Sequence, residues 1–406
     1  MELLNIRPAI LSDASFIARA ILEAVGIENA PDEILQRQTV MCSREDVLYS
    51  WCNSIVAELD GRVVGSLTSY DGRHYRAMRS VTFPLIKEMC GADFTGMADE
   101  TCPGEYYLDS LYVVPDCRRR GIGAALIREG IVRAQALRLP VVSLLVSQEK
   151  PAAARLYRAL GFTETCRLFA FNEDYSKMSI ALSYSPLLEV CAASLASARA
   201  AAHAGAPRIE LCQRLDLGGL TPSHSDIETC VKELSLQTFV LIRPRGGDFC
   251  YSEEEFATIL DDIRFCKAVG AAGVVVGFLN EDGSVQEQQC RDAIAAARPM
   301  QVTFHRAFDR CCDWPKALET IINCGFNRIL TSGQLPTAEQ GLENLKQIHK
   351  QAAGRIHILA GSGVKAANAA QLVDEIPVNE VHGSCKITGY ESDEAEILKT
   401  LAAIRL

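Results

Sequence analysis

Two short apolar segments of the sequence carry the same pair of reactive side chains, a glutamate followed two residues later by a cysteine. The first pair is Glu189 and Cys191, and the second is Glu210 and Cys212. Between them, residues 194–206 are rich in alanine, which predicts a helix joining two parallel strands. Because side chains alternate across a strand, each glutamate and its cysteine face the same side. Two adjacent strands would therefore bring two carboxyls and two thiols together, in a group suited to holding a metal ion.

A second group with chemical potential consists of three arginines and a Gly-x-Gly turn: Arg118, Arg119, Arg120, Gly121, Ile122 and Gly123. Residues 106–114 before it predict a strand, and residues 122–138 repeat apolar side chains at helical spacing. Glycines in such a turn let backbone N–H groups approach a phosphate, and the helix N-terminus adds partial positive charge. The pattern predicts an anion site. It does not predict a dinucleotide site, which needs a third glycine and a downstream acid.

The elements that position these residues form two series, which meet at a short polar break, residues 183–186. We expect one domain over residues 1–183 and a second over residues 187–406. The second contains eight strand-like runs, each followed by a helix-compatible segment: 187–191, 208–212, 238–243, 273–277, 300–304, 327–330, 355–359 and 379–383. Eight such units predict a (β/α)8 TIM barrel, with a doubly wound sheet as the alternative.

A TIM barrel carries its function at the carboxyl ends of its strands. Apart from the two Glu/Cys pairs, the residues expected there are largely polar: Arg243, Arg245, His305, Arg306, Asp309, Ser332, Gly361, Gly363, His382 and Ser384. So many charged and imidazole groups after buried strands predict a concave polar pocket that also includes Glu189 and Glu210. The glycine turns after the seventh and eighth strands occupy the usual phosphate position, and the arginines could add charge for an anion.

Composition narrows the function classes. The 406 residues are 48% hydrophobic and 23% charged, as in a globular protein, and the formal net charge of -10 argues against nucleic-acid binding. No apolar run approaches the roughly 20 residues of a membrane-spanning helix. The N-terminal residues lack the pattern of a signal peptide. The sixteen cysteines are scattered without a Cys-x-x-Cys motif, so we expect a cytoplasmic protein whose thiols are mostly buried.

The first half resembles the GNAT family of acetyltransferases. The resemblance rests on the Arg-x-x-Gly-x-Gly motif, the strand before it, and Leu156-Tyr157 followed by Gly161-Phe162. It implies a GNAT-type mixed α/β sandwich that transfers the acetyl group of acetyl-CoA to a small-molecule amine. The pyrophosphate would contact the amides of residues 121–123, and Tyr157 would protonate the departing thiolate. The pantetheine arm would lie beside three strand residues: Leu111, Tyr112 and Val113.

An acetyltransferase of this kind also needs a general base to deprotonate the acceptor amine. Asp109 on the central strand and Glu105 just before it are the two candidates. One position departs from the family pattern, since Lys150 stands where the family often has asparagine. The acceptor itself cannot be read, because residues 24–50 and 71–104 carry no recognised pattern.

The second half resembles the CutC copper-homeostasis family. The segments that carry this resemblance are EVC (189–191), RIELC (208–212), GGLTPS (218–223), IRPRGGDF (242–249), FHRAFD (304–309) and LTSG (330–333). The resemblance implies a cytoplasmic, oligomeric TIM barrel linked to copper tolerance, with Cys191 and Cys212 as Cu(I) ligands. Cu(I) prefers thiolates, and strands about 4.8 Å apart allow two sulfurs to share one ion.

Three hypotheses follow. In the first, the chain is a fusion of an acetyl-CoA-dependent N-acetyltransferase with a copper-binding barrel. In the second, the barrel is an enzyme acting on a small phosphorylated or carboxylated metabolite, and copper binding is incidental. In the third, one half is catalytically inactive and serves as a binding module.

Overall fold

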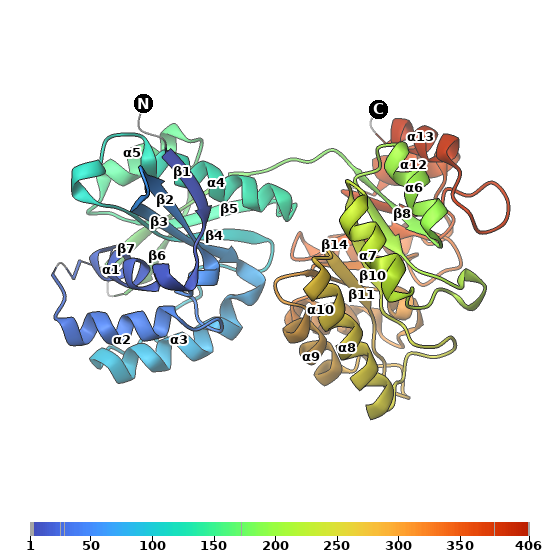
Figure 1. Ribbon diagram of the computed structural model, residues 1–406, viewed down its shortest axis with the longest axis horizontal. Helices are drawn as coiled ribbons and strands as arrows, with labels where there is room; N and C mark the ends of the chain where they lie inside the picture. Colours follow the sequence, from blue (N-terminus) through green and yellow to red (C-terminus); the bar gives the residue numbers. More distant parts are fainter. Residues whose placement is uncertain (1–3, 25, 28, 172, 377, 405–406) are drawn as a thin grey trace. The chain divides into compact units, whose positions relative to one another are not determined.

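The computed structural model describes residues 4–24, 26–27, 29–171, 173–376 and 378–404. The chain forms two compact units, Met1–Ser183 and Tyr184–Leu406, each with its own apolar core (Figure 1). The division falls at the polar break that the sequence contains. The two units are described separately.

The first unit is built on a seven-stranded sheet in the order β1-β2-β3-β4-β5-β7-β6. Its strands are β1 (Leu4–Pro8), β2 (Ser54–Leu59), β3 (Arg62–Asp71), β4 (Glu105–Val113), β5 (Val141–Ser147), β6 (Thr163–Ala170) and β7 (Glu173–Ala181). Only β4 and β5 run parallel; the other neighbours are antiparallel. The sequence did not indicate β6 or β7, because β6 is a mostly exposed edge strand without apolar alternation.

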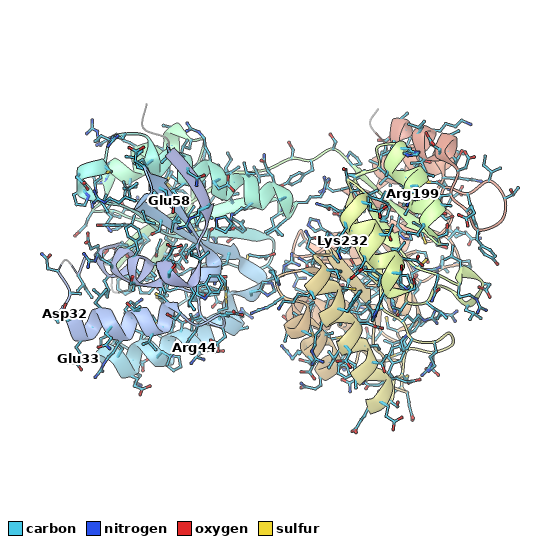
Figure 2. All side chains as sticks on the ribbon, in the orientation of Figure 1. Asp32, Glu33, Arg44, Glu58, Arg199 and Lys232 are labelled. Atoms are coloured by element: carbon cyan, nitrogen blue, oxygen red, sulfur yellow. The ribbon has the colours of Figure 1, made fainter. Side chains whose placement is uncertain are left out.

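Helices cover both faces of this sheet, as the fold class predicted. They are α1 (Ala14–Ala24), α2 (Asp32–Cys42), α3 (Tyr75–Cys90), α4 (Ile122–Ala136) and α5 (Pro151–Ala159). Tyr107 packs with α1, α2 and α3, while its neighbours Tyr106 and Leu108 pack with α4 on the opposite face. This alternation is what a strand between two helical layers requires. At the sheet edge, Glu58 of β2 accepts a hydrogen bond of 2.9 Å from Arg7 of β1 (Figure 2).

Strands β4 and β5 separate partway along their length. They pair between Glu105 and Leu108 of β4, and the pairing ends there although both strands continue. On the other side of β4, the register against β3 shifts at Asp109, which is the additional residue of a β-bulge. A bulge bends its strand and increases the local twist. Residues 109–113 therefore have no ladder partner on β5.

The second unit is a closed barrel of eight parallel strands (Figure 1). They are β8 (Leu187–Ala192), β9 (Arg208–Leu211), β10 (Gln237–Leu241), β11 (Gly273–Val276), β12 (Gln301–Phe304), β13 (Arg328–Thr331), β14 (His357–Gly361) and β15 (Glu380–Gly383). Each predicted run overlaps one strand, and the ends agree within two residues. The TIM barrel prediction is confirmed, and the doubly wound alternative is wrong because the sheet closes.

Eight helices surround the barrel among the described residues: α6 (Leu195–His203), α7 (His224–Glu233), α8 (Glu253–Val269), α9 (Glu287–Ala297), α10 (Trp314–Cys324), α11 (Leu342–Ala352), α12 (Ala366–Glu375) and α13 (Glu394–Ala403). Their inner faces and the outer faces of the strands form one apolar core. Their outer faces carry charges, such as Arg199 on α6 and Lys232 on α7 (Figure 2). The fold therefore follows the usual division into apolar core and charged surface.

The interior of the barrel, by contrast, contains a layer of charged side chains, which we call the ion layer. It consists of Glu189 on β8, Arg208 on β9, Arg328 on β13 and Glu380 on β15, each at most 1% exposed. Arg208 lies 2.5 Å from both Glu189 and Glu380, and Arg328 lies 2.9 Å from Glu380. Burial alone would raise the pKa of Glu380, but the two guanidinium groups hold it well below its usual range. The two arginines and the two glutamates of the ion layer therefore have formal charges that sum to zero.

Phe239 on β10 packs against the two arginines of the ion layer. The guanidinium carbons of Arg208 and Arg328 lie 5.1 and 4.7 Å from the centre of its ring, within cation–π range. The neighbouring strand provides Gly273, where a Cβ atom would fall 2.2 Å from the ring. Gly273 therefore leaves the space that Phe239 occupies.

We expect Glu380→Gln to lower the free energy of unfolding of the barrel by about 3–5 kcal/mol, because two buried arginines lose their shared counter-charge. Glu233→Gln is the matched control. It removes the partner of Arg199 in an exposed pair and should change stability by less than about 0.5 kcal/mol. Urea unfolding would be followed by fluorescence in a Trp51→Phe background, in which Trp314 of α10 reports on the barrel alone. Equal effects of the two substitutions would contradict the stabilising role of the ion layer.

Candidate functional site

The Gly-x-Gly turn of the first unit lies where α4 begins. Gly121 is the residue that precedes the helix, and its φ of +83° is in the left-handed region that favours glycine. No side chain caps the helix at this end, and a Cβ at Gly121 would meet no atom within 4 Å. The start of α4 therefore has no side-chain cap and has free space beside Gly121, two features that suit the binding of anionic oxygens by its first backbone N–H groups.

The three arginines before this turn are all exposed. Arg118 donates a hydrogen bond of 2.9 Å to the carbonyl oxygen of Val113, and its guanidinium lies 5.9 Å from the ring of Tyr112. Arg118 is thus fixed against the part of β4 that has separated from β5. A Cβ added at Gly123 would lie at ordinary van der Waals distance from the side chains of Leu111 and Val113 in the same segment. The structure brings the predicted strand residues and the predicted turn together.

Tyr157 lies on α5 and packs against Phe162, with ring centres 6.2 Å apart. Its side chain is half-buried, and burial raises the pKa of its phenol to about 12. The phenol therefore keeps its proton at neutral pH, as a general acid must.

The two candidate bases have different surroundings. Asp109, at the bulge, accepts hydrogen bonds from Tyr70 (2.5 Å) and Ser110 (2.7 Å), and burial raises the pKa of its carboxyl. Glu105 lies 2.8 Å from the ammonium of Lys177 and also accepts hydrogen bonds from the hydroxyls of Thr101 and Ser143. The Glu105 carboxylate is thus already engaged by one ammonium and two hydroxyls. Asp109 is engaged by two hydroxyls and has no cation beside it among the described residues.

A third carboxyl, which the sequence did not indicate, lies in the same region. Glu100 is 4% exposed and accepts hydrogen bonds from Tyr75 (3.1 Å) and Tyr107 (2.8 Å). Burial, together with the nearby Asp109, raises the pKa of Glu100 to about 8. Its tyrosine partners are 25 and 7 residues away in the chain, so no local spacing connects them.

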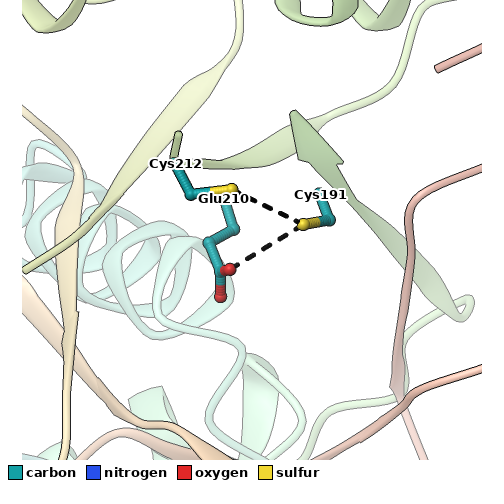
Figure 3. A group of neighbouring side chains, drawn as sticks. All are labelled: Cys191, Glu210 and Cys212. Atoms are coloured by element: carbon teal, nitrogen blue, oxygen red, sulfur yellow. Dashed lines mark hydrogen bonds between the residues drawn. The ribbon is translucent and has the colours of Figure 1, made fainter. Parts of the chain in front are cut away.

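In the barrel, three of the four residues of the Glu/Cys doublet form a tight group (Figure 3). The Sγ atoms of Cys191 and Cys212 are 3.9 Å apart, and a carboxylate oxygen of Glu210 lies 4.0 Å from the sulfur of Cys191. All three are buried. The hydrogen bond to Cys212 and burial raise the pKa of the Cys191 thiol well above its usual value. Without a metal, Cys191 is therefore a neutral thiol.

The strand register explains why Glu189 is separate from this group. In the parallel pair β8–β9, Cys191 is opposite Glu210, and Glu189 is opposite Arg208. Glu189 therefore lies in the ion layer, one step below the thiols. The expectation that two carboxyls and two thiols share one place therefore holds for Cys191, Glu210 and Cys212, while the Glu189 carboxylate lies on the other side of Glu210, within 4.8 Å of it.

His382 on β15 connects the two levels. Its Nε2 atom is 3.6 Å from Glu210 and 3.9 Å from Glu189. Burial alone would lower the pKa of His382, but the Glu210 carboxylate and contact with Cys191 raise it well above its usual value. The Glu210 carboxylate therefore favours the protonated form of His382, which would form an ion pair with it.

A cavity of about 390 Å³ opens at the carboxyl ends of the strands. Several predicted residues line it: Cys191, Glu210, Arg243, His305, Arg306, Gly363, His382 and Ser384. Its wall also contains residues that the sequence did not single out, among them Leu215, Leu241, Phe249, Leu330, Lys386 and Tyr390. The apolar members belong to strand or loop positions without polar signals, and the last two follow the eighth strand in a loop that had no recognised motif.

Six predicted residues do not line this cavity: Glu189, Cys212, Arg245, Asp309, Ser332 and Gly361. Glu189 faces the ion layer. Arg245 instead pairs with Glu255 (2.5 Å) and Asp248 (2.9 Å). Asp309 and Ser332 stand behind Arg306 and hold it by contacts of 2.7 and 2.9 Å.

Fold and site together define a two-part protein, in which an acetyltransferase-type sheet precedes a TIM barrel with a polar mouth. The chain belongs to the CutC family, whose family model matches residues 186–387. The model of the acetyltransferase (GNAT) family matches residues 23–162. Both resemblances predicted from the sequence are confirmed.

Several known proteins are similar to part of this chain. The family protein CutC of Pasteurella multocida is 44% identical over 207 residues, which are 51% of this chain and 84% of that protein. The human copper homeostasis protein cutC homolog is 43% identical over 50% of this chain and 74% of its own length. The crystal structure of an N-acetyltransferase from Staphylococcus aureus covers 43% of this chain and all of that chain, with 20% identity and a TM-score of 0.37.

Among the described residues, no helix combines the length and the apolar character that crossing a membrane requires.

Proposed function

We propose that the first unit is an acetyl-CoA-dependent N-acetyltransferase acting on a small-molecule amine. The observation that carries this proposal is the opening between β4 and β5 beside the uncapped start of α4. The separation leaves the backbone of residues 109–113 without a partner on β5, so an extended arm could pair with it, and the helix start offers amides to a pyrophosphate. One donor molecule would contact both.

The side chains around this opening have properties suited to the two proton transfers of the reaction. Asp109 would accept the proton that the amine nitrogen loses as it bonds to the acetyl carbon. Tyr157 would donate a proton to the thiolate that leaves when the carbon–sulfur bond breaks. Glu100 lies behind Asp109 and is a positioning residue in this proposal, because it accepts a hydrogen bond from Tyr107, whose ring packs against Tyr70, the donor to Asp109.

We expect Gly121→Asn to weaken acetyl-CoA binding by at least about tenfold, because asparagine tolerates the left-handed backbone but places a side chain where the pyrophosphate would lie. Gly91→Asn is the matched control. Gly91 ends α3 with a φ of +77° and equally open surroundings. Calorimetric titration with acetyl-CoA measures both. Absence of binding to the wild-type protein would remove the transferase proposal.

We expect Asp109→Asn to reduce kcat/KM by a factor of about 10²–10⁴, the usual contribution of a general base, while acetyl-CoA affinity is retained. Since burial raises the pKa of Asp109, wild-type kcat/KM should rise with pH over a range above that in which an ordinary aspartate loses its proton. Rates of thiol release with a panel of primary amines would test this. Glu105→Gln is the control, and a larger loss there than in Asp109→Asn would assign the base to Glu105.

We propose that the barrel binds Cu(I) through Cys191 and Cys212, as its family suggests. The carrying observation is the 3.9 Å between their sulfurs. Two sulfurs that share one ion at bonds of about 2.3 Å, the zinc–thiolate value, can be at most about 4.6 Å apart, so the pair fits. The sulfurs lie among apolar side chains, including Leu241 and Val275, which suits a soft cation. The Glu210 carboxylate would be the nearest further ligand.

We expect the wild-type protein to bind one Cu(I) per chain in competition with a Cu(I) chelator under anaerobic conditions. The Cys191→Ser/Cys212→Ser variant should lose this ion. The matched control, Cys230→Ser/Cys266→Ser, also replaces two buried cysteines, but these lie in the core between strands and helices. Equal stoichiometry in the two variants would exclude Cys191 and Cys212 as the ligands.

We further propose that the chain works in a reducing compartment such as the cytoplasm. All sixteen cysteines are free thiols, and five of them are exposed. Exposed thiols persist where the surroundings are reducing.

A further inference from the structure

Arg243 is a buried cation without a counter-ion. It follows β10, is 6% exposed, and lines the cavity at the mouth of the barrel. Its guanidinium donates hydrogen bonds to three backbone carbonyls, those of Leu217, Gly219 and Gly247, and its Nε has no partner. In the described part of the chain, no carboxylate lies within ion-pair distance of it. A buried charge of this kind is costly unless an anion compensates it.

His305 presents an unused donor to the same cavity. It is 5% exposed, and its Nδ1 accepts a hydrogen bond of 3.2 Å from the N–H of Ala307. Burial and the positive charge of Arg243 lower the pKa of His305 to about 3, so the ring is neutral at physiological pH. A neutral ring whose Nδ1 accepts a hydrogen bond carries its proton on Nε2. That Nε2 has no acceptor among the described residues.

The backbone around these two residues is shaped to hold them. A Cβ at Gly277 would fall 2.4 Å from Nδ1 of His305, and a Cβ at Gly218 would fall 3.0 Å from the guanidinium of Arg243. The ring of Phe249 lies 4.8 Å from the His305 ring and 4.9 Å from the Arg243 guanidinium. Glycines and an aromatic ring thus fix both donors in place, so the site is preformed.

The other charges at the cavity are already compensated or lie at its edge. His382 pairs with Glu210, and Arg306 pairs with Asp309. Lys386 is exposed at the rim. Arg243 is therefore the buried charge at this cavity that no described side chain compensates. The volume of about 390 Å³ lies in the range of about 300–1,000 Å³ typical of small-molecule sites, and Leu241 and Leu330 give it an apolar part.

We propose that the mouth of the barrel binds a small organic molecule through a phosphate or carboxylate group, whose oxygens accept the hydrogen bond of His305 Nε2 and neutralise Arg243. The remainder of the molecule occupies the cavity beside Leu241 and Leu330. This oxyanion site is separate in its chemistry from the thiol pair, and it does not depend on copper binding. A bound anion explains why buried Arg243 has no counter-ion and why Nε2 of buried His305 has no acceptor among the described residues.

The test uses the full chain with inorganic phosphate and acetate as probes, observed by phosphorus line broadening and proton saturation transfer. We expect both probes to bind and to compete, with dissociation constants on the order of 1 mM for such small anions. Arg243→Gln and His305→Phe should each weaken binding about tenfold or more. Arg245→Gln is the matched control, because Arg245 lies two residues away, outside the cavity and paired with Glu255. The control should bind both probes like the wild type.

Further outcomes also decide the proposal. Retained binding by the Cys191→Ser/Cys212→Ser variant supports an oxyanion site independent of the metal. If Arg243→Gln unfolds, because it holds three loop carbonyls, then His305→Phe alone decides, since the phenyl ring keeps the contact with Phe249. Equal binding by His305→Phe and the wild type would show an adventitious ion only, and no binding of either probe would equally overturn the proposal.

Discussion

The barrel depends on the ion layer formed by Glu189, Arg208, Arg328 and Glu380. Buried charges of this number are tolerated only when each has its partner, so the layer restricts the register of the four strands that carry it. A slip of one residue along any of them would direct a charge into the apolar core outside the strands. The same register places Cys191 of β8 opposite Glu210 of β9. On the other side of β8, it places His382 of the neighbouring strand β15 opposite Glu189. The site above the layer is thus positioned by the charges beneath it.

In the first unit, one irregularity of the backbone has a comparable role. The bulge at Asp109 ends the pairing between β4 and β5, and it also places a carboxyl at the point where they diverge. Tyr70, whose hydroxyl binds that carboxyl, lies on β3, the strand against which the register shifts. The opening for an extended donor and the candidate base therefore have one structural origin. A regular strand would provide neither.

The sequence was most informative where a pattern repeats or where a motif is local. Eight alternating runs predicted the barrel, and the Gly-x-Gly turn predicted the start of α4. The features that depend on tertiary contacts could not be predicted. The offset between β8 and β9 follows from the pairing of Glu189 with Arg208, and neither residue signals it alone. Arg243 and Arg245 look equivalent in sequence, yet Glu255 binds only the second. Glu100 depends on tyrosines brought from two other elements, so its spacing carried no signal.

The mouth of the barrel combines two chemistries whose demands differ. Cys191 and Cys212 lie against Leu241 and Val275, surroundings that favour neutral thiols or a soft metal ion. Arg243 and His305 lie in the same cavity. Backbone carbonyls bind Arg243 and Phe249 contacts both residues, but the charge of Arg243 has no counter-ion and Nε2 of His305 has no acceptor among the described residues. Because His382 and Glu210 cancel each other, the thiol side is close to neutral whether or not the other side is occupied. The unbalanced charge therefore belongs to the Arg243 side, and an anion there completes the electrostatics of the cavity without involving the sulfurs.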